Sequence, residues 1–471
     1  MTLAIVWFRR DLRLADNPAL AAACAAHAQV LPVYIHAPEE EGAWSPGGAS
    51  RWWLHHSLDA LQHGLRKHHG ELHVRHGDSL QNLLQLIKQT GAHAVYWNRL
   101  YEPAVIARDT RIKAALREHG VEVNSCTGSV WSEPWQIATQ QNEPYRVFTP
   151  YWRRLRPQLE VETPLPVPSP LHAATATGGV TIESLDLLPK IAWDGGMRET
   201  WTPGEQGAQE QLELFADDAI GDYQHARDLP ARHGTSRLSP HLHFGEITPR
   251  QIQHGLHALT QRRDAKRRPD LEPYLRELGW REFAHHLLYH FPETPTQNFN
   301  ARFEQFPWKP AHAQRLQRWQ RGRTGIPLVD AGMRELWHTG WMHNRVRMVA
   351  ASFLTKNLRM HWRHGAEWFW DTLVDADLAN NTLGWQWVAG CGADAAPYFR
   401  VFNPLTQAKK FDPDGAYLRR WLPELADAPL PLLHEPWQDK ALLKRSGYPA
   451  PMVDLGESRQ DALVAYQAIK R

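Results

Sequence analysis

The chain has 471 residues, 42% of them hydrophobic and 22% charged, so it is too long for one compact core and two or three globular domains are expected. Its formal charge of +2 excludes a polycation, and any nucleic-acid binding must therefore come from a local basic patch. The three cysteines lie far apart without zinc or C-x-x-C spacing, and no apolar run approaches the roughly 20 residues of a membrane span. We expect a soluble, cytoplasmic, monomeric protein without a membrane partner.

Residues 1–133 alternate short apolar runs with amphipathic ones. Strands are predicted at 4–8, 30–35, 72–75, 94–97 and 121–123, and helices at 17–27, 50–69, 79–90 and 103–119. Gly70, Gly91 and Gly120 follow three of these helices and are expected to stop them. The alternation predicts an α/β domain with a parallel sheet flanked by helices, and the absence of G-x-G-x-x-G after the first strand argues against a dinucleotide fingerprint.

Residues 134–204 are predicted to be a long linker, because prolines recur from Pro164 to Pro203 among many Ala, Thr and Gly residues. From residue 205 to 471 the pattern is almost purely helical and predicts a mostly α-helical domain. The dense basic tract Gln261–Pro269 is typical of a solvated loop. Tryptophan occurs 22 times, and although most of these rings are expected to fill cores, such an excess also suits proteins that stack flat rings or pass electrons.

Two short motifs suggest ligand contacts, but each also has a purely structural interpretation. The glycine and hydroxyl residues of Gly234–Ser239 precede a predicted helix, where they suit a phosphate or serve as a simple N-cap. Glu277 and Arg281 are four residues apart on a predicted helix and can form a salt bridge. Trp280, beside them, could stack on a base taken out of a DNA duplex.

The windows Thr339–Met348 and Asp375–Trp387 combine tryptophan, arginine, asparagine and paired aspartates, a mixture that ordinary cores do not need. On a helix, Asn344 and Met348 would share one face, and Trp341 and Arg345 another. Arginine suits a phosphate and tryptophan a flat π-system, so the windows indicate a pocket for a large, flat, phosphate-bearing cofactor.

Asp371, Asp375 and Asp377 precede Asn381 in the second window. Paired carboxylates suit metal binding or acid–base catalysis, but no histidine stands at ligand spacing on the same predicted helix, so no metal is expected. A carboxylate beside one of the arginines of the first window would instead form a buried ion pair.

Four more motifs join these signals into one pattern: Trp7–Arg13, Thr324–Met333, Ala351–Lys356 and Asp394–Pro404. In this order and spacing, the chain resembles class I cyclobutane pyrimidine dimer photolyases of the photolyase/cryptochrome family from Val6 to about Pro451. The resemblance implies a DNA-repair lyase with an α/β antenna-type domain and a helical FAD-binding domain. Reduced FAD, excited by blue light, would give an electron to a pyrimidine dimer flipped out of UV-damaged DNA, the cyclobutane ring would open, and the electron would return.

The resemblance also implies the site residues. Asp377 is expected beside Arg347, and Asn381 is expected opposite flavin N5, where a neutral amide suits an anionic reduced flavin. The expected FAD contacts are Tyr223, Thr235, Ser236, Arg237, Leu238, Ser239, Tyr274, Arg281, Trp341, Asn344, Arg347, Asp375, Ala376, Asp377 and Asn381.

Catalytic contacts with the dimer are expected from Glu277, Trp280, Asn344, Met348 and Trp387, and DNA contacts from Glu277, Trp280, Asn344, Arg345 and Gln407. Photolyases that act on (6-4) photoproducts carry histidines at the places of Asn344 and Met348, so the resemblance favours dimer splitting. Trp308, Trp362 and Trp385 match the tryptophan chain that photoreduces the flavin in this family.

The chain departs from the family pattern at two places. Leu383 replaces a glycine that is usual beside the flavin. Ala104 and Val105 stand where folate-binding members often carry Asn-Glu, so the second, antenna chromophore is left open among 5,10-methenyltetrahydrofolate (weakly favoured), a deazaflavin and none. Two other functions compete with repair: a cryptochrome photoreceptor, disfavoured by Asn381 and by the absence of a long polar C-terminal tail, and a flavin oxidoreductase, disfavoured because no nicotinamide fingerprint occurs.

Overall fold

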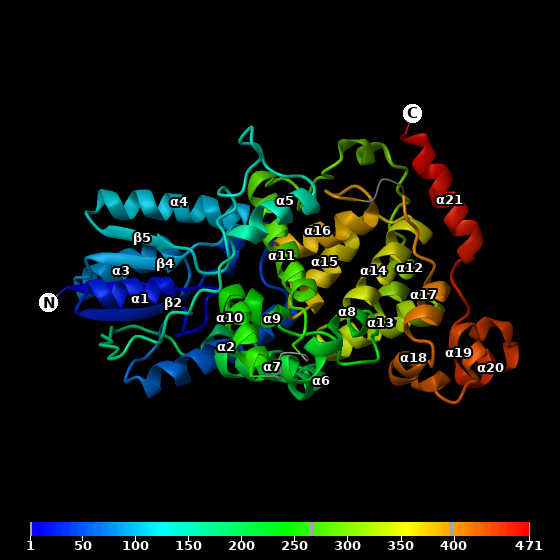
Figure 1. Cartoon of the computed structure of the whole chain (residues 1–471), viewed down its shortest axis with the longest axis horizontal. Coiled ribbons are helices and arrows are strands. Elements are labelled where there is room, and N and C mark those ends of the chain that lie inside the picture. Colours follow the sequence, from blue (N-terminus) through cyan, green and yellow to red (C-terminus); the bar gives the residue numbers. More distant parts are fainter. Residues whose placement is uncertain (1, 263–267, 396–398, 471) are drawn as a thin grey trace. The chain divides into compact units, whose positions relative to one another are not determined.

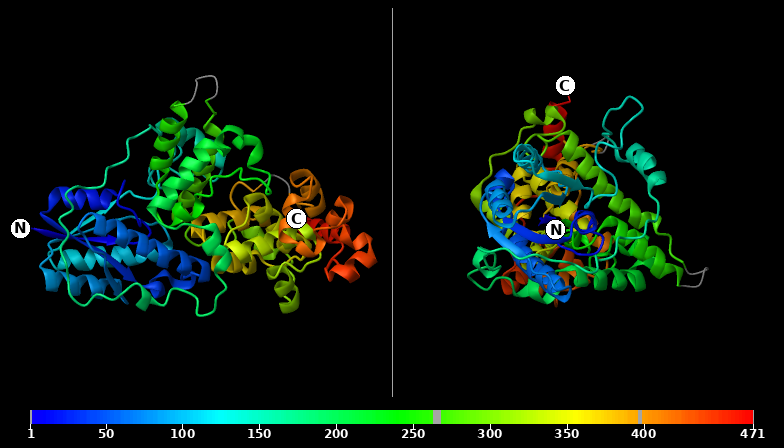
Figure 2. Two further views of the ribbon diagram at one scale, coloured as in Figure 1. Left: turned by 90° about the horizontal axis from the view of Figure 1, so that it is seen from below. Right: turned by 90° about the vertical axis from the view of Figure 1, so that its left-hand side faces the viewer.

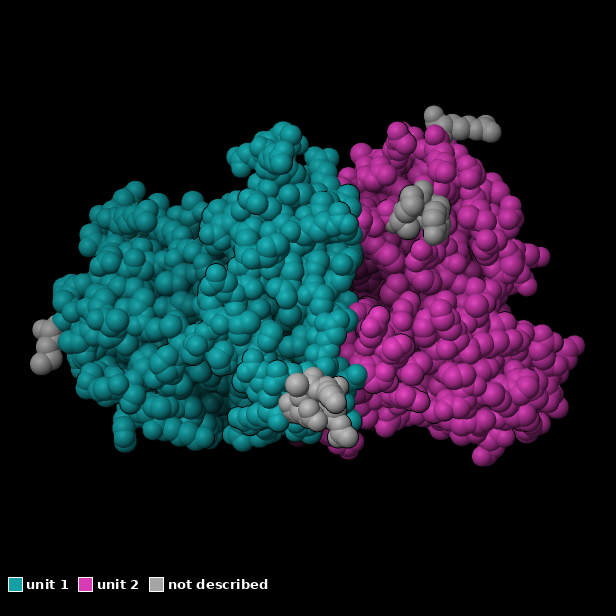
Figure 3. All heavy atoms as spheres, viewed as in Figure 1, with its two compact units in different colours: residues 1–193, 201–221, 236–292 teal, residues 194–200, 222–235, 293–471 magenta. Residues whose placement is uncertain are grey.

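The computed structural model describes residues 2–262, 268–395 and 399–470. The chain forms two compact units (Figure 3). Unit 1 contains the residues up to 193 together with 201–221 and 236–292, and unit 2 contains 194–200, 222–235 and the residues from 293 onward. These units divide the chain at places other than the three predicted ranges, because α-helices from beyond residue 204 pack with the α/β part. The middle of the predicted basic tract, residues 263–267, lies outside the described residues.

Unit 1 is built on a parallel sheet (Figure 1). Within the described residues its strand order is β3-β2-β1-β4-β5, with every neighbouring pair parallel. The strands are β1 (Leu3–Phe8), β2 (Gln29–His36), β3 (His73–His76), β4 (Ala94–Asn98) and β5 (Glu122–Cys126). The predicted α/β fold is confirmed, and each predicted strand lies within three residues of an observed one.

Helices cover the sheet because its strands are apolar on both faces. Trp7 of β1 and Trp97 of β4 pack in one core cluster with Leu83 and Ile112, which come from the helices α3 and α4. Burying such side chains contributes about 1.5–3 kcal/mol each relative to exposure, which holds these helices against the sheet. The helices of this part are α1 (Pro18–Ala26), α2 (Gly48–Lys67), α3 (Ser79–Thr90) and α4 (Pro103–Glu118).

Two of the three predicted glycine stops are confirmed. Gly91 and Gly120 adopt left-handed φ angles of 70° and 73° at the ends of α3 and α4, a conformation that favours glycine. At the end of α2 the prediction is wrong, because His69 takes the left-handed conformation with φ 60°. Gly70 is needed for a different reason: a Cβ there would lie 3.2 Å from the Cβ of Ala173 on the returning chain.

The proline-rich segment runs back along the sheet as extended chain (Figure 2). Val30 forms a parallel bridge with Ala173, and the Val180 amide donates to the Val74 carbonyl at 2.9 Å. The segment predicted as a linker is therefore tied to β2 and β3. It also contains two helices, α5 (Phe148–Leu155) and α6 (Gly195–Thr200).

The remainder of the described chain is helical, as predicted. Unit 1 adds α7 (Glu205–Asp217), α9 (Ser239–His243), α10 (Pro249–Gln261) and α11 (Glu272–His290). Unit 2 contains α8 (Tyr223–Ala226), α12 (Ala313–Gln320), α13 (Pro327–Thr339), α14 (Asn344–Ser352), α15 (Trp362–Thr372), α16 (Leu378–Ala389), α17 (Pro404–Phe411), α18 (Ala416–Trp421), α19 (Leu430–His434), α20 (Lys440–Ser446) and α21 (Leu455–Ala468). A single π-helical turn, Phe353–Asn357, follows α14. Across the part of the chain that the structure describes, no helix is both long and apolar enough to cross a membrane.

The motif Trp7–Arg13 serves the architecture of unit 1. The Arg13 side chain is fully buried, and its guanidinium donates to the carbonyls of Asp16, Gly128 and Gly245 at 2.7, 2.8 and 2.8 Å. Gly128 follows β5 and Gly245 follows α9, so one side chain joins three segments that are far apart in sequence. Burial lowers the pKa of Arg13, and the charges of neighbouring carboxylates oppose that shift.

We therefore expect Arg13→Met to reduce the free energy of unfolding by about 2–4 kcal/mol, because it leaves three buried carbonyls without their donor. Urea unfolding followed by circular dichroism measures the change. The control is Arg111→Met, since Arg111 is exposed and, among the described residues, makes only a 3.7 Å ion pair with Asp78. Equal stability of the two variants would contradict the structural role of Arg13.

Candidate functional site

Unit 1 presents its share of the predicted site on α11. Tyr274 is buried, whereas Glu277 and Trp280 are half-buried one turn apart. The Tyr274 hydroxyl donates to Oγ of Ser236 at 3.0 Å, which ties α11 to the hydroxyl-rich stretch Gly234–Ser239. Burial raises the pKa of Tyr274, so this hydroxyl stays a neutral donor.

The hydroxyl-rich stretch does not cap a helix. Leu238 occupies the N-cap position of α9, and no side chain accepts a capping hydrogen bond there. Arg237 has a φ of 52°, a left-handed conformation that costs a non-glycine residue of order 1 kcal/mol. Its guanidinium lies 5.7 Å from the Trp201 ring centroid. Simple capping thus fails as an explanation of the motif, and the strained arginine among hydroxyl groups fits a ligand-binding turn.

A neighbouring segment anchors α11 through buried polar groups. The Arg281 guanidinium donates to the Ser129 carbonyl at 2.7 Å, and the Trp131 amide donates to the Glu282 carboxylate at 2.9 Å. His286 adds a 2.9 Å hydrogen bond to the Pro134 carbonyl. Arg281 is 3.6 Å from Glu282 rather than paired with Glu277, so the predicted salt bridge between Glu277 and Arg281 is not found. The described contacts of Arg281 are structural.

Unit 2 contains the predicted ion pair, which is half-buried rather than buried. Arg347 donates to Asp375 at 2.8 Å and to the Met342 carbonyl at 2.6 Å, and its guanidinium lies 5.8 Å from the Trp341 ring centroid. The prediction that Asp377 lies beside Arg347 is wrong. Asp377 is the N-cap of α16, where its carboxylate accepts from the backbone of that helix.

The expected helical face shared by Trp341 and Arg345 is also wrong. Gly340 ends α13 in a left-handed conformation and His343 caps α14, so Trp341 lies in the connection between the two helices. Asn344 and Met348 do lie one turn apart on α14, the first exposed and the second half-buried.

Asn381 lies in the first turn of α16, which follows the half-buried Asp375 and the buried Ala376 and Asp377. Its side-chain amide donates to the Ala366 carbonyl of α15 at 3.0 Å. This orients the carbonyl oxygen of the Asn381 amide away from Ala366, as an acceptor. Helix α16 continues without interruption through Leu383, so the departure from the usual glycine does not break the helix here.

The predicted DNA contacts of unit 2 are held by neighbours that the sequence did not reveal. Arg345 pairs with Asp228 at 2.6 Å, and its guanidinium lies 4.4 Å from the Phe411 ring centroid. Gln407 is half-buried on α17, and its Oε1 has no hydrogen-bond partner within the described residues. An unsatisfied buried acceptor of this kind suits a ligand that donates a hydrogen bond.

The three predicted electron-transfer tryptophans lie along α15 and its neighbours. Trp308 is 5.0 Å from His361 and His361 is 5.5 Å from Trp362, measured between ring centroids. Gly365, one turn after Trp362, leaves no room for a Cβ beside the Trp385 ring. The Trp362 indole donates to Asn298 at 2.8 Å, which sets the orientation of its ring.

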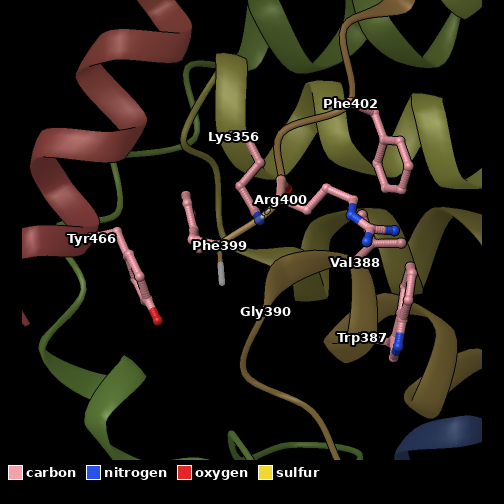
Figure 4. A pocket seen from close by; sticks show the side chains of 8 residues that line it. All are labelled: Lys356, Trp387, Val388, Gly390, Phe399, Arg400, Phe402 and Tyr466. Carbon is pink, nitrogen blue, oxygen red and sulfur yellow. Dashed lines mark hydrogen bonds between the residues drawn. The ribbon is translucent and has the colours of Figure 1, made fainter. Parts of the chain in front are cut away.

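Trp387 borders a small cavity in unit 2 (Figure 4). The volume of the cavity is about 20 Å³, which is room for about one water molecule and excludes a cofactor. Lys356 of the π-helical turn points into it, donates to the Arg400 carbonyl at 3.1 Å and lies 3.5 Å from the Phe399 ring centroid. Burial lowers the pKa of Lys356 to about 7. The cavity is therefore a small packing defect beside Trp387 and not a ligand site.

Glu282 supplies a pH test of how α11 is anchored. Burial raises the pKa of Glu282 to about 7, above the ordinary value near 4.5 that the unfolded chain would show. The folded state therefore binds the extra proton, and stability falls as pH rises from about 4.5 to 7. We expect Glu282→Gln to remove this dependence. The variant should therefore become more stable relative to the parent protein as pH rises from 5 to 8, by on the order of 3 kcal/mol in the free energy of unfolding. Melting temperatures of the two proteins, measured across this pH range, check the trend. A constant difference across that range would contradict a raised pKa.

The family described as DNA photolyase matches residues 4–170, and the family described as the FAD binding domain of DNA photolyase matches residues 274–468. The deoxyribodipyrimidine photo-lyase of Agrobacterium fabrum is 46% identical over 99% of this chain and 98% of its own length. Cryptochrome-2 of Arabidopsis thaliana is 39% identical over 97% of this chain and 77% of its own length.

Solved structures agree with the sequence comparison. A bacterial class III photolyase from Agrobacterium tumefaciens has a TM-score of 0.94 and 45% identity, covering 100% of this chain and 98% of that one. Near-complete coverage at this identity extends to both the α/β and the helical parts. The chain therefore belongs to the photolyase/cryptochrome family.

Proposed function

We propose that this protein is a light-dependent DNA-repair lyase that splits cyclobutane pyrimidine dimers. The observation that carries the proposal is the 46% identity to a deoxyribodipyrimidine photo-lyase over nearly the whole of both chains. A relationship of this extent includes the FAD-binding part, so FAD is the cofactor. Bound FAD, when reduced and excited by blue light, supplies the electron that opens the dimer.

The donor set in both units fits FAD. In unit 1 the hydroxyl groups of Ser236 and Ser239 and the guanidinium of the strained Arg237 provide donors suited to a diphosphate, while the Tyr274 hydroxyl donates to Oγ of Ser236 and positions it. The further residues proposed to contact FAD are Tyr223, Thr235 and Leu238. Arg281 is the weakest member, because its guanidinium already serves the Ser129 carbonyl.

In unit 2, we assign the isoalloxazine ring to the group around the Arg347–Asp375 ion pair. The pair places a compensated charge at 2.8 Å separation, which can face a flavin ring without leaving a lone buried charge. Asn381 offers a carbonyl oxygen as acceptor, which suits a flavin N5 that carries a proton. Trp341, Asn344, Ala376 and Asp377 complete the proposed set.

The dimer is assigned to Glu277, Trp280, Asn344, Met348 and Trp387. Glu277 accepts a hydrogen bond from a ring N–H of the lesion, while Trp280 and Trp387 offer apolar walls. Asn344 and Met348 cannot transfer a proton as histidines can, which favours a reaction that needs none. Arg345 and Gln407 contact the DNA strand, and the Arg345–Asp228 pair has to loosen if Arg345 is to meet a phosphate.

The finer class differs from the prediction from motifs. Assignment to class I is not supported, because the structure with TM-score 0.94 is that of a class III photolyase. We assign the chain to class III. For the second chromophore, 5,10-methenyltetrahydrofolate, a deazaflavin and none stay open, as the sequence left them. We propose that the protein is a cytoplasmic monomer, as the sequence predicted.

A cryptochrome-type photoreceptor is the second candidate, favoured by the 39% identity to a plant cryptochrome. Plant cryptochromes carry aspartate at the place of Asn381. An amide that donates to the Ala366 carbonyl cannot act as an acid toward the flavin, which favours repair over signalling.

Blue-light repair of an oligonucleotide with one thymine dimer tests the proposal. We expect the photoreduced protein to restore the thymines in light and not in the dark. Glu277→Ala should lower the repair rate by about 10- to 100-fold, the loss expected when a charged hydrogen bond to the lesion is removed. Glu118→Ala, at an exposed place at the end of α4, is the control and should repair normally. Flavin photoreduction without any repair would contradict the lyase.

The tryptophan relay has its own test. We expect Trp362→Phe to slow photoreduction of oxidised FAD strongly, because phenylalanine is much harder to oxidise than tryptophan. Repair by chemically reduced protein should persist, since the relay acts only on the oxidised cofactor. Trp97→Phe, a buried substitution in β4 of unit 1, is the matched control. Equal photoreduction rates in the two variants would refute the assignment of Trp362.

A further inference from the structure

Trp280 is stacked face to face on a residue from another helix. The ring of Phe148, on α5, lies 3.7 Å from that of Trp280 between centroids, with 12° between the planes. Trp152, also on α5, continues the stack at 6.2 Å and 16° from Phe148. Phe148 is fully buried, whereas Trp280 is half-buried. One face of the Trp280 indole is therefore covered by protein and fixed in plane.

The ring of Phe148 is itself held on several sides. The Arg276 guanidinium, one turn before Trp280 on α11, lies 4.9 Å from the Phe148 centroid. Phe283 meets both rings edge-on, 5.8 Å from Phe148 and 5.9 Å from Trp280. The edge-on contacts of Phe283 gain specific attraction beyond the area they bury, and the close face-to-face contact of Phe148 with Trp280 adds dispersion attraction.

Helix α5 is fastened to the beginning of α11. Glu272, the first residue of α11, accepts from the Trp152 indole at 3.0 Å and from Arg156 at 2.7 Å. The Trp152 ring also lies against Gly279, where a Cβ would have no room. These contacts leave Phe148 little freedom to follow a movement of Trp280, so the indole has to keep the plane that Phe148 sets.

We propose that Phe148 is a positioning residue for lesion binding, which holds the Trp280 indole so that its other face packs against a pyrimidine dimer. This inference rests on the proposed function, in which Trp280 is a wall of the lesion site. An indole ordered before binding loses less conformational freedom when the dimer arrives. Undamaged DNA does not use this surface, so the stack contributes to discrimination between damaged and undamaged DNA.

The test compares dissociation constants for an oligonucleotide with and without a thymine dimer. We expect Phe148→Leu to reduce the ratio of these constants by about 3- to 10-fold, the range that an aromatic pair of this kind contributes. The variant keeps apolar volume and removes the ring, and Phe148→Met replaces it if the leucine variant fails to bind FAD. Phe8→Leu, a buried substitution in β1, is the control for a general loss of packing and should leave the ratio unchanged.

A double-mutant cycle with Trp280→Ala separates positioning from general stability. If Phe148 acts through Trp280, Phe148→Leu has no further effect on the ratio when Trp280 is already alanine. An equal effect in both backgrounds, or no effect in either, would overturn the proposal. If Trp280→Ala alone leaves the ratio unchanged, the role of Trp280 fails and this inference with it, while light-dependent repair is judged separately by the Glu277 experiment.

Discussion

The position of α11 depends on one buried carboxylate. Glu282 is 2% exposed, and the backbone amides of Trp131 and Ser132 donate to it at 2.9 and 3.3 Å. Burying such a group without donors costs several kcal/mol, so the helix and the segment that follows β5 have to keep their register. The side chains proposed to meet the lesion, Glu277 and Trp280, stand within two turns of this anchor. Their geometry therefore follows from packing of the α/β part rather than from a mobile loop.

In unit 2 the short turn before α16 organises the proposed flavin contacts in a similar way. Asp375 pairs with Arg347, while the carboxylate of Asp377, two residues later, accepts from the backbone amide of Asn380 in the first turn of the helix. One carboxylate thus faces a charge and the other starts the helix that carries Asn381. Two acidic residues that look alike in sequence have different functions because only one occupies the N-cap position.

Local patterns predicted the strands and the helices of the α/β part, because buried parallel strands are continuous apolar runs and their helices have clear ends. The site residues were predicted from motifs, but most of the side chains that contact them could not be predicted. Asp228 lies 117 residues from Arg345, and Phe148 is 132 residues from Trp280, so no short-range pattern connects them. Arg347 pairs with Asp375 and not with the predicted Asp377, because Asp377 caps α16. Residue spacing alone does not show which of two nearby aspartates occupies an N-cap. No residue pattern that we used distinguished class I from class III, and the class followed only from the comparison with a solved structure.

The central claim is catalysis rather than light sensing, and turnover tests it most directly. The photoreduced protein should be mixed with a large excess of thymine-dimer DNA, and repaired dimers per protein should be counted under blue light. We expect many repaired dimers per protein in light and none in the dark. A count that stays at zero while the flavin is reduced by light would contradict the lyase and leave the photoreceptor.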